Sequence, residues 1–286
     1  MKNKLERLIL RRGLWQAEIL PGYAANTIRL RCGGEDVVRT PESDEEFLKD
    51  HIVYGICFLL PPDRTVGGCF TFGGETYTLP LNDAYKLSNL HGLMHDADFE
   101  VTEQTEERAV LYYSNRGERY PFHFNVTVTC RISETGYQVS YCFTNTGPGP
   151  MPLLFGLHAN FKDQDWVKVP VAGEMMMDLR TKAPFPRVEA LSEEGEALKA
   201  GEKSAEKKIQ GFFTAQGHIA EIGDYRYCVS ENFTHWVLWN GKGGEGFISV
   251  EPECGPVNGL QYDDGHIVLG KDQSIVFSTE IRRKNS

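Results

Sequence analysis

Short segments in which apolar and polar residues alternate recur along most of the chain, and they limit the possible folds more than any other feature. A period of two places successive side chains on opposite faces of a strand, whereas an amphipathic helix needs a period of 3.6. The strand-like segments are residues 27–31, 122–130, 137–143, 236–239, 247–250, 267–269 and 274–278. Glycine-rich turns separate many of them. This pattern predicts an all-β protein, a large antiparallel β-sandwich or barrel.

Two segments depart from the strand pattern. Residues 41–50 read PESDEEFLKD, which predicts a short exposed helix. Residues 188–208 are rich in Glu, Lys, Ala and Ser, which predicts a solvated and partly helical excursion. Neither segment is long or distinct enough to mark a second domain. We therefore expect residues 1–286 to form one domain.

Charge and cysteine content exclude several classes of partner. The chain has 30 Lys and Arg against 40 Asp and Glu, a formal net charge of −10, which argues against a nucleic-acid backbone or an anionic membrane as the main partner. The sequence shows neither an apolar stretch of signal-peptide length nor a membrane-spanning run. The seven cysteines form no C-x-x-C pair and are expected to be reduced thiols. We expect a cytoplasmic protein.

Two motifs have ordinary structural explanations. Residues 241–246 match G-x-G-x-x-G, but a strand-like segment follows where a dinucleotide site needs a helix, so we expect a hairpin loop. His91 and His95 are four residues apart, and on a helix both imidazoles would face one metal. Gly92 and Asn89 favour a loop instead. We expect no metal site.

In each of four segments, one polar, ionisable residue is flanked by apolar residues or by glycine and proline. Singly, each residue is explained by an ion pair, a core hydrogen bond or solvation. Glu251 is expected at the end of a strand, just before a proline, where strands deliver side chains to a site. The four are Arg64 in residues 55–68, His91 in 89–92, His158 in 152–161 and Glu251 in 251–256.

Taken in order, these segments resemble the aldose 1-epimerase (galactose mutarotase-like) family over residues 14–281. The chain is most similar to a bacterial branch of uncharacterised members that includes hexose-6-phosphate mutarotases. The resemblance rests on Pro62-x-Arg64-x-x-Gly67-Gly68 with Phe70 and Gly74–Tyr77, Asn89-Leu90-His91-Gly92, Tyr120-Pro121-Phe122, Met151-Pro152, Gly156-Leu157-His158, Trp239-Asn240 and Glu251-Pro252.

The resemblance implies a galactose mutarotase-like supersandwich, a large antiparallel β-sandwich with a sugar cleft on one face. It implies a cofactor-independent isomerase, an aldose 1-epimerase acting on a small-molecule aldose, with Glu251 as general base and His158 as general acid. Arg64 and His91 are expected to bind sugar hydroxyls or the ring oxygen. No metal or cofactor is expected, and the protein is expected to be a monomer or a homodimer.

Anomer exchange explains why these residue types are needed. A base removes the proton of the C1 hydroxyl, an acid protonates the ring oxygen, and the ring opens to the aldehyde, rotates about C1 and closes. A carboxylate with an ordinary pKa near 4.3 is ionised at neutral pH, and an imidazole near 6.5 can give and recover a proton. Trp239, Trp236 or Phe161 could pack on the apolar face of the sugar.

Departures from the family pattern leave the substrate open. In the phosphosugar branch an arginine commonly lies four residues after the motif histidine, and this chain has His95 there as a candidate substrate-binding residue. The aspartate that binds sugar in galactose mutarotases finds no match, since the region of Phe212 and Phe213 occupies its place. A neutral aldose is favoured. The alternatives are a hexose-6-phosphate mutarotase, a non-catalytic carbohydrate-binding or sensor protein, and an epimerising or lyase-type enzyme on the same fold.

Overall fold

A computed structural model describes residues 4–83, 87–163, 165–178, 184–203 and 207–284. This part of the chain is built mainly from antiparallel strands. Its largest sheet has the order β10-β11-β12-β13-β25-β21-β20-β16. These strands are β10 (Glu100–Gln104), β11 (Arg108–Arg116), β12 (His123–Ile132), β13 (Gly136–Asn145), β25 (Ser274–Arg283), β21 (Tyr225–Val229), β20 (Ile219–Ile222) and β16 (Val167–Lys168).

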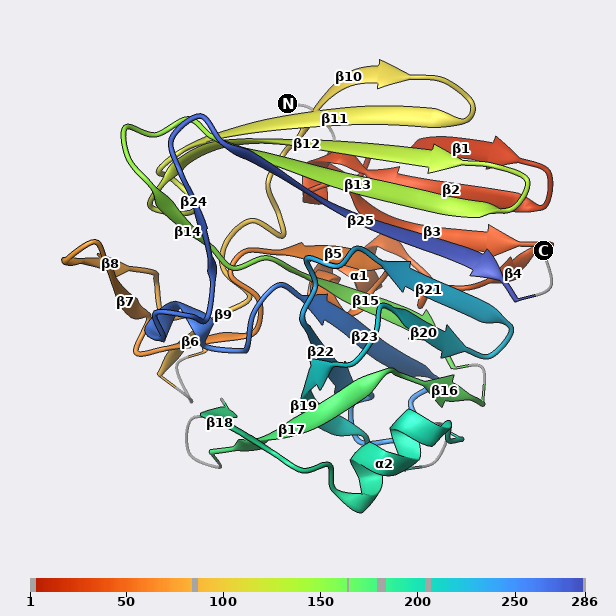
Figure 1. The fold of residues 1–286 in the computed structure, drawn as a ribbon. Coiled ribbons are helices and arrows are strands. Elements are labelled where there is room, and N and C mark those ends of the chain that lie inside the picture. The colour runs from red at the N-terminus through yellow and green to blue at the C-terminus, as the bar shows by residue number, and fades with distance from the viewer. Residues whose placement is uncertain (1–3, 84–86, 164, 179–183, 204–206, 285–286) are drawn as a thin grey trace.

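A second sheet of seven strands has the order β18-β17-β19-β22-β23-β15-β5. Its strands are β18 (Pro184–Glu189), β17 (Val171–Met177), β19 (Gln210–Ala215), β22 (His235–Trp239), β23 (Phe247–Glu253), β15 (Gly156–Lys162) and β5 (Ile56–Leu59). The two sheets pack face to face across the core (Figure 1). Phe161 of β15, for example, meets Tyr227 of β21 with ring centroids 5.1 Å apart.

Smaller elements complete the described part. A four-stranded sheet contains β1 (Leu8–Arg12), β2 (Trp15–Leu20), β3 (Asn26–Cys32) and β4 (Glu35–Asp36). Three two-stranded sheets pair β14 (Met151–Leu153) with β24 (Ile267–Leu269), β6 (Arg64–Val66) with β9 (Ser88–Leu90), and β7 (Cys69–Phe72) with β8 (Glu75–Thr78). The helices are α1 (Asp44–Lys49) and α2 (Glu193–Ala200), with 3-10 turns η1 (Pro21–Tyr23), η2 (His51–Val53) and η3 (Gly259–Gln261).

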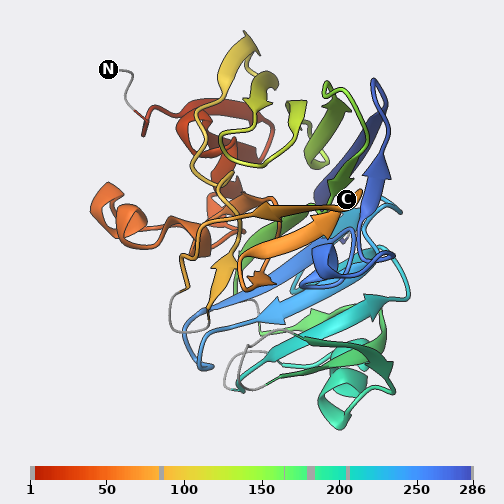
Figure 2. The same ribbon diagram turned by 90° about the vertical axis from the view of Figure 1, so that its left-hand side faces the viewer.

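The alternating pattern correctly predicted the all-β antiparallel fold. Residues 123–130 of the predicted segment 122–130 lie in β12, and the 134–136 turn joins it to β13. The expected helices in 41–50 and 188–208 are α1 and α2, although residues 204–206 lie outside the described part. The loop 241–246 joins the antiparallel pair β22 and β23, as expected for a hairpin. In Figure 2 the N-terminal segment and α2 lie at opposite ends of the molecule.

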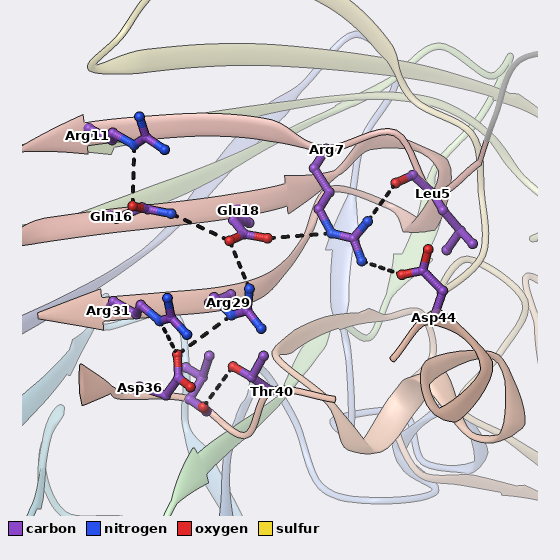
Figure 3. A network of polar contacts seen from close by, with 11 residues as sticks. Leu5, Arg7, Arg11, Gln16, Glu18, Arg29, Arg31, Asp36, Thr40 and Asp44 are labelled. Atoms are coloured by element: carbon purple, nitrogen blue, oxygen red, sulfur yellow. Dashed lines mark hydrogen bonds and ion pairs between the residues drawn. The ribbon is translucent and has the colours of Figure 1, made fainter. Parts of the chain in front are cut away.

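Charged residues cover the outer face of the four-stranded sheet (Figure 3). Glu18 of β2 is only 8% exposed and lies between Arg7, with Nε 3.5 Å from a carboxylate oxygen, and Arg29, at 3.1 Å. Arg7 also donates to Asp44, the first residue of α1. Single exposed pairs of this kind stabilise a fold little, but this network ties α1 to the sheet. The chain continues from α1 into η2.

No helix in the ranges that the structure describes is long and apolar enough to cross a membrane.

Candidate active site

The seven-stranded sheet turns one face to the core and presents a row of polar residues on the other. On β15, Leu157 and Ala159 point into the core cluster, so His158 and Asn160 lie on the opposite face. The same alternation places Ile248 and Val250 of β23 in the core. It brings three polar residues of β23 onto the opposite face, namely Ser249, Glu251 and Glu253.

The expected acid and base come together on neighbouring strands. His158 Nε2 lies 3.6 Å from Glu251 Oε1. Their side chains are 6% and 3% exposed, so both groups are nearly removed from water. The separation exceeds a good hydrogen bond, and a sugar oxygen can therefore approach both atoms.

A correction concerns the strand that carries Glu251. We expected it to end there, but β23 continues through Pro252 to Glu253. The paired positions between β15 and β23 stop at Ser249 and resume at Glu253. Proline lacks a backbone N–H and is tolerated where the ladder is interrupted. The interruption lies beside His158 and Glu251, at the site itself.

Arg64 and His91 reach the site from the short β6–β9 sheet, where Arg64 pairs with Leu90. The backbone N–H of His91 donates to Asp63 O at 2.7 Å, which ties the two segments together. His91 has a positive φ of 62° and is followed by Gly92 at 63°, so the chain turns sharply here. The imidazole of His91 lies 5.4 Å from that of His158, edge to face.

These segments surround a cavity of about 270 Å³. This volume is close to the lower end of the range for small-molecule pockets, about 300 Å³. Asp63, Asp50 and Gln210 also line the cavity, although sequence reasoning did not select them. The full lining is Asp50, Ile52, Val53, Asp63, Arg64, Leu90, His91, His158, Gln210, Phe212, Val237, Leu238, Trp239 and Glu251.

Burial changes the protonation of the pair from what the sequence suggested. It raises the pKa of Glu251 well above its usual range, and the charge of Asp63 adds to this. It lowers the pKa of His158 to about 4, against an opposing contribution from the hydrogen bond to Asn160. Both directions favour a carboxylic acid beside a neutral imidazole. Both shifts oppose the ionised Glu251 that its ordinary pKa led us to expect.

Arg64 is held by two carboxylates. Its guanidinium donates to Asp63 at 2.9 Å and to Asp83 at 3.1 Å. Burial raises the pKa of Asp63 to about 6, even though Arg64 opposes that rise. Arg64 is also the single Lys or Arg among the described residues that line the cavity, which include three carboxylates. The lining therefore carries no excess of positive charge.

The other predicted binding residues have different positions. Trp239 lines the cavity, with its ring 5.9 Å from that of His158. His95 is not part of the lining, because the left-handed turn at His91 directs the chain away and His95 instead bonds His51 at 2.8 Å. Phe161 and Trp236 are buried in the core, on the far face of the sheet, so the idea that they pack on sugar is wrong.

Among the residues that the structure describes, no group of three or more His, Cys, Asp or Glu side chains could hold a metal ion.

Comparison with known families decides the identity of the chain. The profile of the family described as aldose 1-epimerase matches residues 26–282. The chain belongs to the aldose 1-epimerase family. Among curated proteins, the uncharacterized protein YihR of Escherichia coli K12 is 28% identical over 120 residues, 41% of this chain. That match spans only 38% of the relative's length.

Solved structures show the same fold. A galactose mutarotase-like protein from Clostridium acetobutylicum superposes with a TM-score of 0.87 and 22% identity, over 96% of this chain and 94% of the other. A GalM/aldose epimerase homologue from Caenorhabditis elegans gives a TM-score of 0.81 and 14% identity, over 97% and 98%. At such identities the likeness establishes the aldose 1-epimerase fold of this family member, with the candidate site on its seven-stranded sheet.

Glu253 is an unusual neighbour of this site. It lies two residues after Glu251 on the same face, is 0% exposed, and neither carboxylate oxygen has a hydrogen-bond partner in the described structure. Burial raises its pKa well above the usual range, helped by the charges of Asp63 and Glu251. Its sequence signal was the two-residue spacing from Glu251, which places both side chains on one face of a strand.

Glu253→Gln is expected to stabilise the protein at high pH and to leave it nearly unchanged at low pH. A raised folded-state pKa means that the protonated carboxyl contributes fully below the unfolded pKa and loses its contribution as pH rises through the folded value. Glutamine does not ionise, so the variant is expected to gain at least about 1 kcal/mol at pH 8. Urea unfolding of both proteins at pH 4.5 and pH 8 measures this, and equal stabilities at pH 8 would contradict it.

Proposed function

We propose that this protein is a mutarotase that interconverts the α and β anomers of a neutral aldose, with Glu251 and His158 as its proton-transferring pair. The observation that carries the proposal is the buried pair, with 3.6 Å between Nε2 and Oε1, in a cavity that fits one sugar ring. Membership of the aldose 1-epimerase family supports the reaction class.

In the proposed reaction, sugar hydroxyls enter the cavity and solvate the Glu251 carboxylate, which favours its ionised form. The proton that Glu251 carries before the sugar binds then resides on His158 Nε2. Glu251 removes the proton from O1 while His158 protonates the ring oxygen, and the C1–O5 bond breaks. After rotation about C1, O5 attacks the other face of the aldehyde. His158 then recovers its proton, and Glu251 returns one to O1.

Arg64 and His91 serve as binding residues in this proposal. Arg64 is fixed by Asp63 and Asp83, so its remaining N–H groups point in set directions toward substrate oxygens. His91 Nδ1 is buried and has no hydrogen-bond partner in the described structure, and burial lowers the pKa of this imidazole well below its usual range. A neutral His91 can donate to or accept from a sugar hydroxyl.

The charges of the cavity favour a neutral sugar over a sugar phosphate. A phosphate needs cationic donors, ideally arginines in bidentate geometry. The one arginine of the described lining already serves two carboxylates, and Asp50 and Glu251 add further acidic groups. Transfer of a phosphate dianion into this cavity is therefore unfavourable.

The test is anomer exchange measured by polarimetry and by NMR. Freshly dissolved α-glucose and α-galactose are expected to equilibrate far faster with the protein than in buffer, whereas glucose 6-phosphate and galactose 6-phosphate gain much less. The anomeric signals alone are expected to change, which separates a mutarotase from an epimerising or lyase-type enzyme. Binding of sugar by calorimetry with no acceleration of any aldose would instead identify a carbohydrate-binding protein and overturn the proposal.

A further inference from the structure

Asn160 contacts the nitrogen of His158 that faces away from Glu251. Its Oδ1 lies 2.9 Å from His158 Nδ1, and Asn160 is 0% exposed. The two residues are two positions apart on β15 and therefore lie on the same face of the sheet. The proposed reaction gives Asn160 no direct contact with the sugar, and it does not line the cavity.

The surroundings of Asn160 fix the orientation of its amide. Its Nδ2 lies 3.0 Å from the backbone oxygen of Ile52 and 3.2 Å from that of Gly55, and it also approaches that of His158 at 3.1 Å. Carbonyl oxygens can only accept, so the NH₂ group must face them. The hydroxyl of Ser249, on β23, donates to Oδ1 at 2.7 Å and supports the same orientation.

An amide oxygen has no proton to give, so the nitrogen of His158 that faces it must donate. In a neutral imidazole one nitrogen carries the proton and the other is free to accept. We infer that Asn160 is a positioning residue that holds His158 in the tautomer protonated at Nδ1, so that Nε2 alone exchanges protons within the cavity. The assignment of Nε2 to the reaction rests on the proposed function, whereas the tautomer itself does not.

An asparagine at this position has a consequence that an aspartate would not share. A carboxylate in contact with Nδ1 would favour the imidazolium, whereas an amide orients the ring without adding charge. The other groups that act on His158 are Glu251 on β23, His91 directly after β9, Cys57 opposite it on β5, and the charge of Arg39. Asn160 therefore sets the direction of the ring without placing a negative charge beside it.

The tautomer can be read directly, without any activity. Protein labelled with ¹⁵N-histidine is expected to show, at pH 7.5 and without sugar, a protonated Nδ1 and an unprotonated Nε2 for His158. In Asn160→Ala the Nδ1 proton loses its acceptor, and signal intensity is expected to move toward the Nε2-protonated form. A proton on Nε2 in the parent protein, or an unchanged tautomer in Asn160→Ala, would overturn the inference.

Asn115 offers a matched structural control. It is also 0% exposed, and its amide donates to the backbone oxygens of Tyr120 and Phe122 while its Oδ1 accepts from the Arg119 N–H. Asn115→Ala removes a similar set of buried hydrogen bonds on β11 of the eight-stranded sheet, so it is expected to leave the His158 signals unchanged. A general loosening of the fold would move them in both variants and would count against a specific role for Asn160.

Asn160→Asp tests the absence of charge. The carboxylate is expected to raise the pKa of His158 by about one unit or more. If the active pair holds one proton, acid inactivates it by adding a second, and the acidic limb of kcat is expected to move to higher pH by the same amount. The NMR titration of His158 must move with it, even if no substrate has been found. An unmoved titration would overturn the inference, whereas inactivity of the parent protein toward all sugars would refute only the proposed function.

Ser249→Ala is a milder variant in case Asn160→Asp does not fold. It removes one donor to Asn160 Oδ1 and leaves the three backbone acceptors of the amide in place. The Nδ1 tautomer is expected to persist, because those acceptors alone orient the amide. Loss of the tautomer in Ser249→Ala would show that the hydroxyl, rather than Asn160, controls the ring.

Discussion

Glu251→Gln and His158→Asn are each expected to lower kcat for anomer exchange by at least about a hundredfold. Each change removes one of the two groups proposed to exchange protons with the sugar and keeps a side chain of similar shape. Because the groups act as a unit, the double variant is expected to be scarcely slower than either single variant. Saturation kinetics by polarimetry measure kcat and KM separately, and the loss is expected mainly in kcat.

The same sheet provides matched controls for both substitutions. Glu253→Gln makes the same chemical change two residues further along β23. His235→Asn replaces a histidine of β22 that lies opposite Glu253 in the strand register. Neither residue lines the cavity, so both controls are expected to retain rates close to that of the parent. Losses in the controls as large as those in Glu251→Gln and His158→Asn would mean that the sheet, rather than the pair, is responsible.

Gly92→Ala is expected to destabilise the protein by about 3 kcal/mol or more, a loss typical of severe backbone strain. Gly92 has a φ of 63°, and a Cβ built there would lie 1.9 Å from the backbone oxygen of Leu60 and 2.9 Å from the nitrogen of Pro61. Since both are main-chain atoms, the corner that carries Arg64 would have to move. Urea unfolding measures the loss, and sugar binding is expected to weaken because His91 is adjacent.

Gly33→Ala separates backbone strain from the steric clash. Gly33 has the same φ of 63°, but a Cβ there would meet nothing within 4 Å. Its loss is expected to be only about 1 kcal/mol, the ordinary cost of a left-handed alanine. If Gly92→Ala cost no more than Gly33→Ala, the close packing of Gly92 on Leu60 would have no energetic importance.

The parts of the fold that the sequence predicted depend on local pattern. Alternation identifies a strand whatever it pairs with, so β12, β13 and their turn were predictable, as were the two helices. The extent of β23 was not, because Pro252 is normally a reason to end a strand. Only the interrupted pairing with β15, a property of two distant segments, makes a proline acceptable there.

In the candidate site, too, the sequence predicted what depends on local pattern and not what depends on contacts between distant segments. Four ionisable residues could be predicted as site residues because each is flanked in the sequence by apolar residues or by glycine and proline. The structure places all four in the lining of one cavity, namely Arg64, His91, His158 and Glu251. The sequence did not predict Asp83, because its role depends on a contact with Arg64, which is distant in the sequence. It did not predict Asn160, because its role depends on the orientation of its amide. His95 illustrates the reverse error, since spacing from His91 says little once two consecutive left-handed residues turn the chain.

The two kinds of site residue come from different parts of the architecture. Glu251, His158 and Asn160 lie on β23 and β15 of the seven-stranded sheet packed on the core, whereas Arg64 lies in the small β6–β9 sheet and His91 directly follows that sheet. Substitutions in the small sheet are therefore expected to alter the proposed sugar binding more than the proposed proton transfer. Under the proposed function, the small sheet is the part of the structure in which the preferred sugar can change separately. It is therefore the place where a protein engineer should begin to retarget specificity.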